Sequence, residues 1–372
     1  MIHCPACLNT NLEIIYRFGK APIFNHVFFD SRDTAKKAKS GAIELRGCRG
    51  CGLVFNAIFS SRLARYTEHY DNTQNYSKFF TAFSEKLAQD LVRKYDLKNK
   101  NIVEVGCGKG NFVEILYDLG VKNMVGFDPA YTDYNPKIDR LVVKKYFNKN
   151  TIKKKADFII CRHTLEHIPK PKEFIASIVS CLAEDGKMYF EMPDLEWIVK
   201  NKTFFDFTYE HCNYFTPHSL YNLFAQFGFK HITFKKGLDG QYIQAEISRG
   251  KPNTARYKSV SFAKTGAFIS SSIGRAARMV KGAGRFIVWG AGGKGVFFLN
   301  RLKVDYKRCD RVIDINKSQH GRYIPGTAQQ VVAPNVLNDG GVDSIIIMNP
   351  VYKKEISQSA RSFGFKGKFV VV

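Results

Sequence analysis

The sequence predicts an α/β protein built around a mostly parallel sheet, and three patterns along its 372 residues support this fold class. Apolar runs of strand length alternate with amphipathic runs of helix length over residues 61–250. Two glycine-rich turns each follow such a strand and open a helix. Two pairs of closely spaced cysteines lie near the N-terminus. These patterns predict a Rossmann-like sheet flanked by a small N-terminal unit and a C-terminal Rossmann-like unit.

The composition is that of a globular protein with a large core, and its charge leaves the partner open. Hydrophobic residues make up 45%, and 57 Lys and Arg against 33 Asp and Glu give a net charge of +24. Such an excess is typical of proteins that bind nucleic acid, an anionic membrane surface or a phosphate-bearing small molecule, and also of surfaces with many solvated lysines. The chain has neither an apolar run of membrane-spanning length nor a signal-peptide pattern, so we expect a cytoplasmic protein.

Residues 1–60 contain two CxxC pairs, which have three interpretations. A disulfide framework is disfavoured in a reducing compartment, and a redox site needs one pair at a helix start. Four thiolates that close a tetrahedral zinc site fit the spacing best. Such a site has no open position, so the zinc would be structural and would stabilise a unit too small for a large core. The ligands are Cys4, Cys7, Cys48 and Cys51.

Residues 61–250 carry the first glycine-rich turn, in "VEVGCGKGNF", and close with a predicted hairpin, "KHITFKKGLDGQYIQAEISR". Asp128 ends the next strand, where a carboxylate can accept hydrogen bonds from both hydroxyls of a ribose. The turn, the acidic strand end and the closing hairpin together resemble S-adenosylmethionine (SAM) binding. The alternative is a tight strand–helix turn without a ligand. The residues of this predicted site are Glu104, Gly106, Gly108, Gly110 and Asp128.

Two further segments of this region gather polar side chains. "CRHTLEHI" places His163, Glu166 and His167 at a strand end, where α/β sheets bind ligands, although a histidine there is more often structural. "YEHCNYF" precedes a helix predicted to have Thr216 as N-cap and Gly228 as C-cap. It is either an aromatic loop that packs on this helix or a site.

Residues 251–372 begin with a basic helix over 255–283 and contain the second glycine-rich turn, "WGAGGKG". By spacing, this turn and Asp314 form a dinucleotide fingerprint. Nearby Lys294, Arg322 and Tyr323 suit a nucleoside diphosphate equally well. The residues alone therefore leave NAD and another nucleotide open.

The order of these motifs, from the CxxC pairs through "RHTLEHI" and "YEHCNYF" to "GRYIPGT", resembles the three-domain sugar C-methyltransferases over essentially the whole chain. The resemblance implies that residues 1–60 bind zinc and help to close the active site. It implies that 61–250 form a class I methyltransferase domain that binds SAM, with 61–84 as a connecting segment. It also implies that 251–372 hold the nucleotide part of the substrate, and it argues against NAD.

The resemblance also assigns roles to residues. Glu210 and His211 become the catalytic pair, although family members carry Tyr-His-Glu-His where this chain has Thr208-Tyr209-Glu210-His211. The assigned residues are, for catalysis, His211, Glu210, Tyr209, His167 and Tyr214; for SAM, Tyr70, Ser77, Glu104, Gly106, Gly108, Gly110, Asp128, Arg162 and His163; and for the substrate, Lys294, Arg322 and Tyr323.

The predicted reaction is methylation of a carbon in a keto sugar linked to a nucleoside diphosphate. His211 would remove the proton next to the ketone, Glu210 would orient the imidazole, and Tyr209 or Tyr214 would face the oxygen. We expect a monomer or dimer that binds neither nucleic acid nor membrane. The alternatives are O-methylation of a sugar, or methylation of RNA or protein held by the basic surface.

Overall fold

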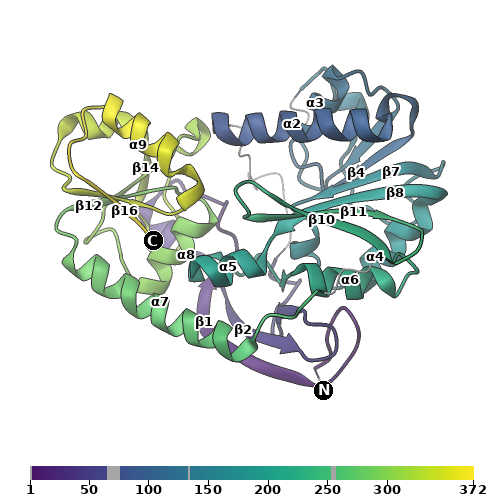
Figure 1. The fold of residues 1–372 in the computed structure, drawn as a ribbon. Coiled ribbons are helices and arrows are strands. Elements are labelled where there is room, and N and C mark those ends of the chain that lie inside the picture. Colours follow the sequence, from purple (N-terminus) through teal and green to yellow (C-terminus); the bar gives the residue numbers. More distant parts are fainter. Residues whose placement is uncertain (1, 65–75, 133–134, 253–256) are drawn as a thin grey trace.

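The computed structural model describes residues 2–64, 76–132, 135–252 and 257–372, and its strands form three sheets (Figure 1). The first sheet is antiparallel in the order β1-β2-β3-β9, and its first three strands come from the N-terminal region. Its elements are β1 (Leu12–Pro22), α1 (Arg32–Lys36), β2 (Ser40–Cys48), β3 (Val54–Asn56) and β9 (Asn213–Tyr214).

The central sheet has the order β10-β11-β8-β7-β4-β5-β6. Its five strands from β8 to β6 are parallel, and β11 lies antiparallel between β8 and β10, so the predicted closing hairpin is confirmed. The strand order reverses at β4, and ligands bind α/β sheets outside such a point. The strands are β4 (Ile102–Val105), β5 (Met124–Phe127), β6 (Val142–Val143), β7 (Ala156–Arg162), β8 (Leu182–Pro193), β10 (His231–Gly237) and β11 (Tyr242–Ser248).

Helices cover both faces of the central sheet, because alternate residues of each strand point to opposite faces. Ile102 and Ile160 pack with α2 and α3, whereas Val103 and Ile159 pack with α4 and α6 (Figure 1). The elements are α2 (Lys78–Tyr95), η1 (Leu97–Asn99), α3 (Asn111–Asp118), η2 (Asp139–Leu141), η3 (Leu165–His167), α4 (Pro171–Cys181), α5 (Leu195–Asn201), η4 (Phe204–Asp206) and α6 (Pro217–Ala225).

Helix α6 begins as predicted and ends earlier than predicted. Thr216 Oγ1 accepts a hydrogen bond from Ser219 N at 3.1 Å, and Ser219 Oγ accepts one from Thr216 N at 2.9 Å, which closes a reciprocal cap. The C-cap is Gln226, not Gly228. Gly228 instead takes the left-handed conformation, with φ of 82°, two residues beyond the cap.

The third sheet is parallel, in the order β14-β13-β12-β15-β16. The predicted basic helix precedes it as α7 and starts at Phe262, with Ser261 as its N-cap. The elements are α7 (Phe262–Gly282), β12 (Phe286–Trp289), α8 (Gly293–Leu302), β13 (Arg311–Ile313), η5 (Lys317–Gln319), β14 (Gln330–Val332), η6 (Pro334–Asp339), β15 (Ser344–Ile347), η7 (Pro350–Tyr352), α9 (Lys353–Ser362) and β16 (Lys368–Val371).

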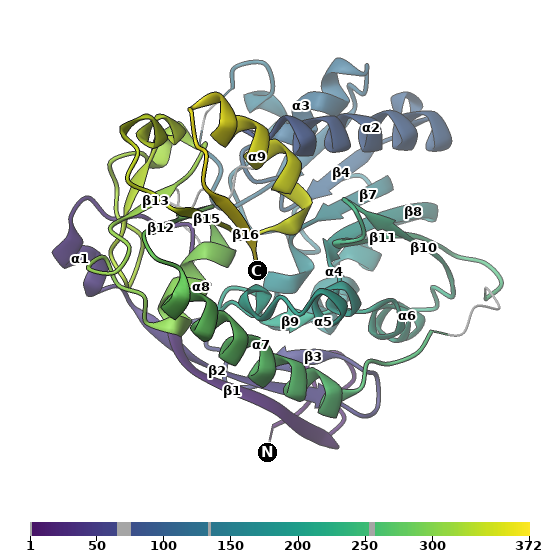
Figure 2. The ribbon, with the colours of Figure 1, turned by 60° about the vertical axis from the view of Figure 1, so that its left-hand side comes forward.

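One apolar core joins the first sheet to the third. It contains side chains from β1 and β2, from the segment of α5 and η4, and from α7, α8 and β12. Helix α7 lies close against β1 (Figure 2), and a Cβ at Gly266 would stand 2.7 Å from the carbonyl oxygen of Ile15. Glycine therefore permits this approach.

Strand β9 links the N-terminal sheet to the central region. Val54 pairs with Tyr214 and Phe55 with Asn213, so the end of "YEHCNYF" is a strand of the first sheet. The next residues start α6, which covers the central sheet. The predicted domain boundaries at residues 60 and 250 stay predictions, but this pairing fixes residues 208–212 between two sheets.

Candidate active site

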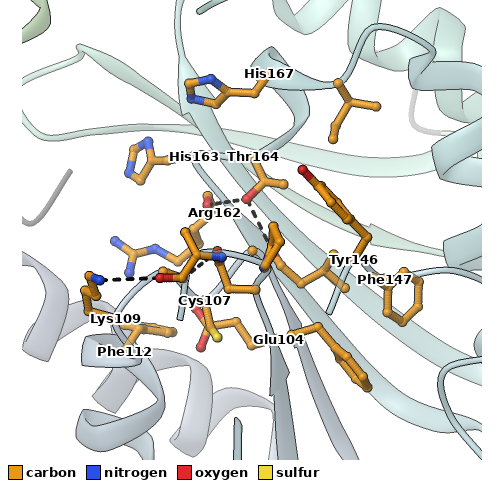
Figure 3. Close-up of a pocket in the computed structure, with 18 of the residues that line it drawn as sticks. Glu104, Cys107, Lys109, Phe112, Tyr146, Phe147, Arg162, His163, Thr164 and His167 are labelled. Atoms are coloured by element: carbon orange, nitrogen blue, oxygen red, sulfur yellow. Dashed lines mark hydrogen bonds between the residues drawn. The ribbon is translucent and has the colours of Figure 1, made fainter. Parts of the chain in front are cut away.

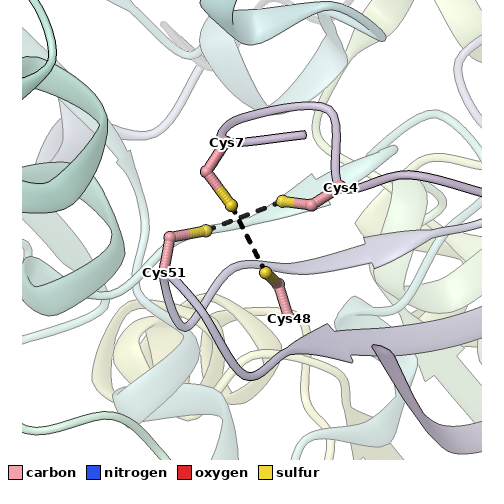
Figure 4. Close-up of side chains that lie close together, drawn as sticks. All are labelled: Cys4, Cys7, Cys48 and Cys51. Carbon is pink, nitrogen blue, oxygen red and sulfur yellow. Dashed lines mark hydrogen bonds between the residues drawn. The ribbon is translucent and has the colours of Figure 1, made fainter. Parts of the chain in front are cut away.

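The four predicted zinc ligands meet at one point (Figure 4). Their Sγ atoms all lie within 4.8 Å of one another, with 3.6 Å between Cys4 and Cys51 and 3.5 Å between Cys7 and Cys48. Sulfurs held at about 2.3 Å by a tetrahedral zinc stand roughly 3.8 Å apart. The cluster is therefore compatible with a zinc ion.

The two CxxC turns have the same backbone hydrogen bonds. Leu8 N donates to Cys4 O and Gly52 N donates to Cys48 O, at 2.9 and 2.8 Å. The amide of each first cysteine donates to the carbonyl five residues ahead, at 2.9 Å for Cys4 and 2.8 Å for Cys48. Leu8 and Gly52 both take the left-handed conformation. Each turn thus presents both of its sulfurs to one side.

We expect about one zinc per chain in protein purified without added metal, measured by elemental analysis. Cys48→Ser should lose the metal and lower the unfolding temperature, because three thiolates and a hydroxyl hold zinc poorly and the N-terminal sheet has few other staples. Cys181→Ser, at a buried cysteine outside the cluster, should keep the metal. Metal-free wild type with undiminished stability would contradict the prediction.

The first glycine-rich turn is held by the strand that follows it. Gly106 N donates to Phe127 O at 2.8 Å, and Gly108 N donates to Asp128 Oδ2 at 2.9 Å. The other oxygen of Asp128 accepts a hydrogen bond from Ala130 N at 2.8 Å. Asp128 therefore ties the turn to the end of β5. A Cβ at Gly106 would stand 1.9 Å from Thr164 Oγ1, so this glycine is sterically required.

A first cavity of about 500 Å³ opens beside this turn (Figure 3). A Cβ at Gly108 would meet nothing within 4 Å, so the backbone is exposed to a ligand there. Among the described residues, Glu104 Oε2 is buried and has no hydrogen-bond partner. Space, bare backbone and an unsatisfied acceptor fit SAM. The predicted residues in its lining are Glu104, Gly106, Gly108, Asp128, Arg162 and His163.

Three other residues predicted for SAM are placed differently. Gly110 is the N-cap of α3, with φ of 78°. Ser77 lines a second cavity, and its hydroxyl donates to Glu355 Oε2 at 2.7 Å. Tyr70 lies outside the described residues.

Burial dominates the electrostatics of the first cavity. It raises the pKa of Glu104 to about 7, against the attraction of Arg162. It also raises the pKa of Asp128, although the amides of Ala130 and Gly108 oppose the shift. Arg162 donates to Glu191 Oε1 at 3.0 Å through Nε, and its guanidinium lies 4.2 Å from the ring centroid of Phe112.

The second cavity, of about 560 Å³, adjoins the first and extends to the glycine-rich turn of the third sheet. His163 and His167 line both cavities and so form the wall between them. His163 directly follows β7 with φ of 49°, and its ring stands 4.5 Å from that of Tyr242. Other side chains around the second cavity include Asn25, His26, Glu166, Thr208, Glu210, His211, Gln241, Lys294, Asp314 and Asn349.

His167 and His211 form a pair in the second cavity. Their rings meet edge to face, with centroids 4.8 Å apart. Burial lowers the pKa of His167 to about 3 and that of His211 well below its usual range, and each ring disfavours a charge on its neighbours. Both imidazoles are therefore neutral at physiological pH, which is the form that accepts a proton.

The other residues of "YEHCNYF" point elsewhere. Tyr209 Oη accepts a hydrogen bond from Ser60 N at 3.0 Å, and the hydroxyl of Tyr214 donates to Thr208 O at 3.0 Å. Both tyrosines are buried outside the linings of the two cavities, so the structure does not place either hydroxyl toward a substrate oxygen as predicted. Glu210 Oε1 accepts a hydrogen bond from the amide of Asn25.

The residues predicted for the nucleotide separate in the structure. Lys294 lines the second cavity at the start of α8 and forms an ion pair with Asp206. Arg322 lies 3.5 Å from Asp30, half exposed, and Tyr323 pairs through its backbone with Phe29. Both lie outside the cavity lining because the first sheet's loop, not the cavity, faces them.

The second glycine-rich turn repeats the bonding of the first. Gly290 N donates to Ile313 O at 2.8 Å, and Ala291 N donates to Asp314 Oδ2 at 2.8 Å. His26 lies against this turn, where a Cβ at Gly292 would stand 3.2 Å from its ring. Asn25 and His26 belong to the N-terminal region and have no motif around them, so no pattern in the sequence singles them out. Glu166 stood within a motif without receiving a role.

Comparison with known proteins agrees with this arrangement. Residues 73–233 match the family described as a methyltransferase domain, and residues 240–372 match the C-methyltransferase C-terminal domain. The chain is a SAM-dependent methyltransferase. The predicted α/β fold class of this enzyme is thereby confirmed.

Three similar proteins show how far this methyltransferase resembles others. The C-methyltransferase NovU of Streptomyces niveus is 21% identical over 99% of this chain and 94% of its own length. A mitochondrial ubiquinone biosynthesis O-methyltransferase of Dictyostelium discoideum is 24% identical over 34% of this chain and 42% of its own. The structure of magnesium protoporphyrin IX methyltransferase from Synechocystis PCC 6803 with bound SAH covers 46% of this chain and 84% of its own, with 14% identity and a TM-score of 0.34.

None of the helices that the structure describes combines the length and the apolar composition required to span a membrane.

Proposed function

We propose that this protein transfers a methyl group from SAM to a carbon of a keto sugar carried by a nucleoside diphosphate. One observation carries the proposal. Two cavities of ligand size share a wall of His163 and His167, and His211 stands beside His167 in the second cavity. A methyl donor in the first cavity and an acceptor in the second would meet where neutral imidazoles are available.

The second cavity suits a substrate with two chemically different ends. Near His211 it is lined by histidines and by the buried carboxyl groups of Glu166 and Glu210. At its other end lie Lys294 and the first amides of α8, a ten-residue helix whose N-cap is Gly292. Backbone amides at a helix start and a lysine bind phosphate oxygens well. A keto sugar at the first end and a diphosphate at the second fit this distribution.

The chemistry assigned to this chain's residues is proton removal and orientation. When bound, SAM supplies a methyl group on a positively charged sulfur. His211, neutral because it is buried, removes the proton from the carbon next to the ketone. His167 packs on its ring and limits its rotation. Glu210, through the amide of Asn25, holds the N-terminal segment over the cavity. Walls of buried side chains exclude water from the carbanion.

Similarity to NovU and the match to a C-methyltransferase C-terminal domain support carbon as the acceptor. O-methylation needs a hydroxyl and a base but no ketone, so the acceptor atom distinguishes it. Methylation of RNA or protein is the reading favoured by the net charge of +24 alone.

The proposal predicts a mass increase of one methyl group when a nucleoside-diphosphate keto sugar is incubated with the enzyme and SAM. Mass spectrometry of a panel of such sugars measures this, and fragmentation distinguishes a carbon-bound from an oxygen-bound methyl group. The matched control is the corresponding sugar with the ketone reduced to an alcohol, which has no acidic proton to remove. Methylation of the reduced sugar alone, or of RNA or protein instead of any sugar, would overturn the proposal.

A further inference from the structure

Glu166 is a buried carboxyl group beside the histidine pair. It lies in η3, is 2% exposed and lines the second cavity. Among the described residues, its Oε2 atom has no hydrogen-bond partner. The side-chain ligand atoms of Glu166, His167 and His211 all lie within 4.8 Å of one another. An unsatisfied carboxyl oxygen is costly to bury, and here it stands next to the base that the proposed reaction uses.

A second buried carboxyl group nearby, Glu191, is bonded very differently. Its Oε1 contacts Arg162 and stands 3.2 Å from His163 Nε2, and its Oε2 accepts hydrogen bonds from Tyr189 and Gln244, both at 3.0 Å. These partners hold Glu191 as an anion, with a pKa lowered to about 2. Glu191 is therefore unsuited to receive a proton.

We propose that Glu166 is the final proton acceptor of the reaction and receives, from the imidazolium of His211, the proton taken from the substrate carbon. This inference rests on the proposed function. It makes Glu166 a proton carrier at the site and not only a packing residue.

The proton and charge balance favour this assignment. The C–H bond breaks, its proton goes to His211, and its electron pair forms the new C–C bond to the methyl group. The sulfonium thereby becomes a neutral thioether. The imidazolium N–H then gives its proton to the carboxylate of Glu166, which becomes a neutral acid. A cation and an anion are present before the reaction and neither remains afterwards, so no isolated buried charge is left.

Glu166 must be ionised when this sequence starts. Burial raises its pKa to about 8, with Glu191 adding a repulsion, so at pH 7 most molecules hold it protonated. A positive sulfonium in the adjoining cavity favours the carboxylate. Cofactor binding should therefore release a proton from Glu166. The titratable and charged groups around it are His163, His167, His211, Glu191, Cys161 and Cys212, with His26 and Lys294 across the cavity.

Calorimetric titration of SAM at pH 7, in three buffers with different enthalpies of ionisation, counts the protons released. Wild type should release more protons than Glu166→Gln, by a difference approaching one per chain. Glu104, whose pKa is also raised, is present in both proteins and cancels. Titration with the neutral product SAH should remove the difference. Glu173→Gln, at an exposed carboxyl group on α4, should match wild type.

Glu166→Asp keeps an ionisable group and should restore proton release if Glu166→Gln fails to bind SAM or to fold. Equal proton release from wild type and Glu166→Gln, or from SAM and SAH, would overturn the inference. These readouts need no acceptor sugar, so they fail or succeed independently of the proposed function.

With a confirmed acceptor, Glu166→Gln should lower kcat by about 100-fold. In wild type kcat should fall as the pH falls through the pKa of Glu166, because only the carboxylate accepts a proton. This limb should disappear in Glu166→Gln, while the KM for SAM stays within a few-fold. A wild-type pH profile in Glu166→Gln would count against the inference while leaving the methylation itself intact.

Discussion

His211→Asn is expected to lose most methyl transfer, by roughly 100- to 10,000-fold, because it removes the general base. The variant should still fold and bind SAM, since His211 lines the second cavity and lies outside the lining of the first. Asparagine fills part of the space of the imidazole but accepts no proton at physiological pH. Exchange of solvent deuterium at the carbon next to the ketone should be lost together with turnover.

Glu210→Gln is the matched control for this result. Its carbonyl oxygen can still accept the hydrogen bond from the amide of Asn25, so the N-terminal segment should stay in place and activity should fall less. If His211→Asn exchanges the substrate proton and turns over at wild-type rates, His211 is a packing residue. The base would then be sought first at His167, whose ring touches it.

Asp128→Ala is expected to weaken SAM binding by about 10- to 100-fold, which corresponds to the loss of one charged hydrogen bond worth about 1.5–3 kcal/mol. The carboxylate both orders the glycine turn, through the amide of Gly108, and is the predicted acceptor for the ribose hydroxyls. Calorimetric titration of SAM into wild type and variant measures the change.

Asp314→Ala offers a matched comparison, because Asp314 holds the second glycine-rich turn through Ala291 N in the same way. It should leave SAM affinity unchanged. Equal affinity for SAM in wild type and Asp128→Ala would show that the ribose is bound elsewhere. A loss of affinity in both variants would instead indicate a general loss of structure.

The features that sequence alone predicted correctly are those set by short-range spacing. A CxxC turn brings its own two sulfurs together, and a carboxylate at the end of β5 necessarily faces the turn after β4 because the two strands are parallel neighbours. The closing hairpin follows from two apolar runs around a glycine-containing turn. None of these requires knowledge of a distant partner.

The features that sequence did not predict depend on pairing between distant segments. Tyr209 and Tyr214 turn away from the cavity because β9 joins β3 and places their hydroxyls on the backbone of Ser60 and Thr208. Ser77 contacts Glu355, from a helix near the other end of the chain. Periodicity carries no information on such contacts, so the substrate side of the site was predicted less well than the SAM side.

The pairing of β3 with β9 also bears on the order in which the chain folds during synthesis. Cys51 completes the proposed zinc cluster early, and the hairpin of β1 and β2 can form at once. The edge of β3 must then wait for Tyr214, after most of the central sheet has been made. An unpaired strand edge invites wrong pairing during that interval. Early metal binding would hold this edge in its register until its late partner arrives.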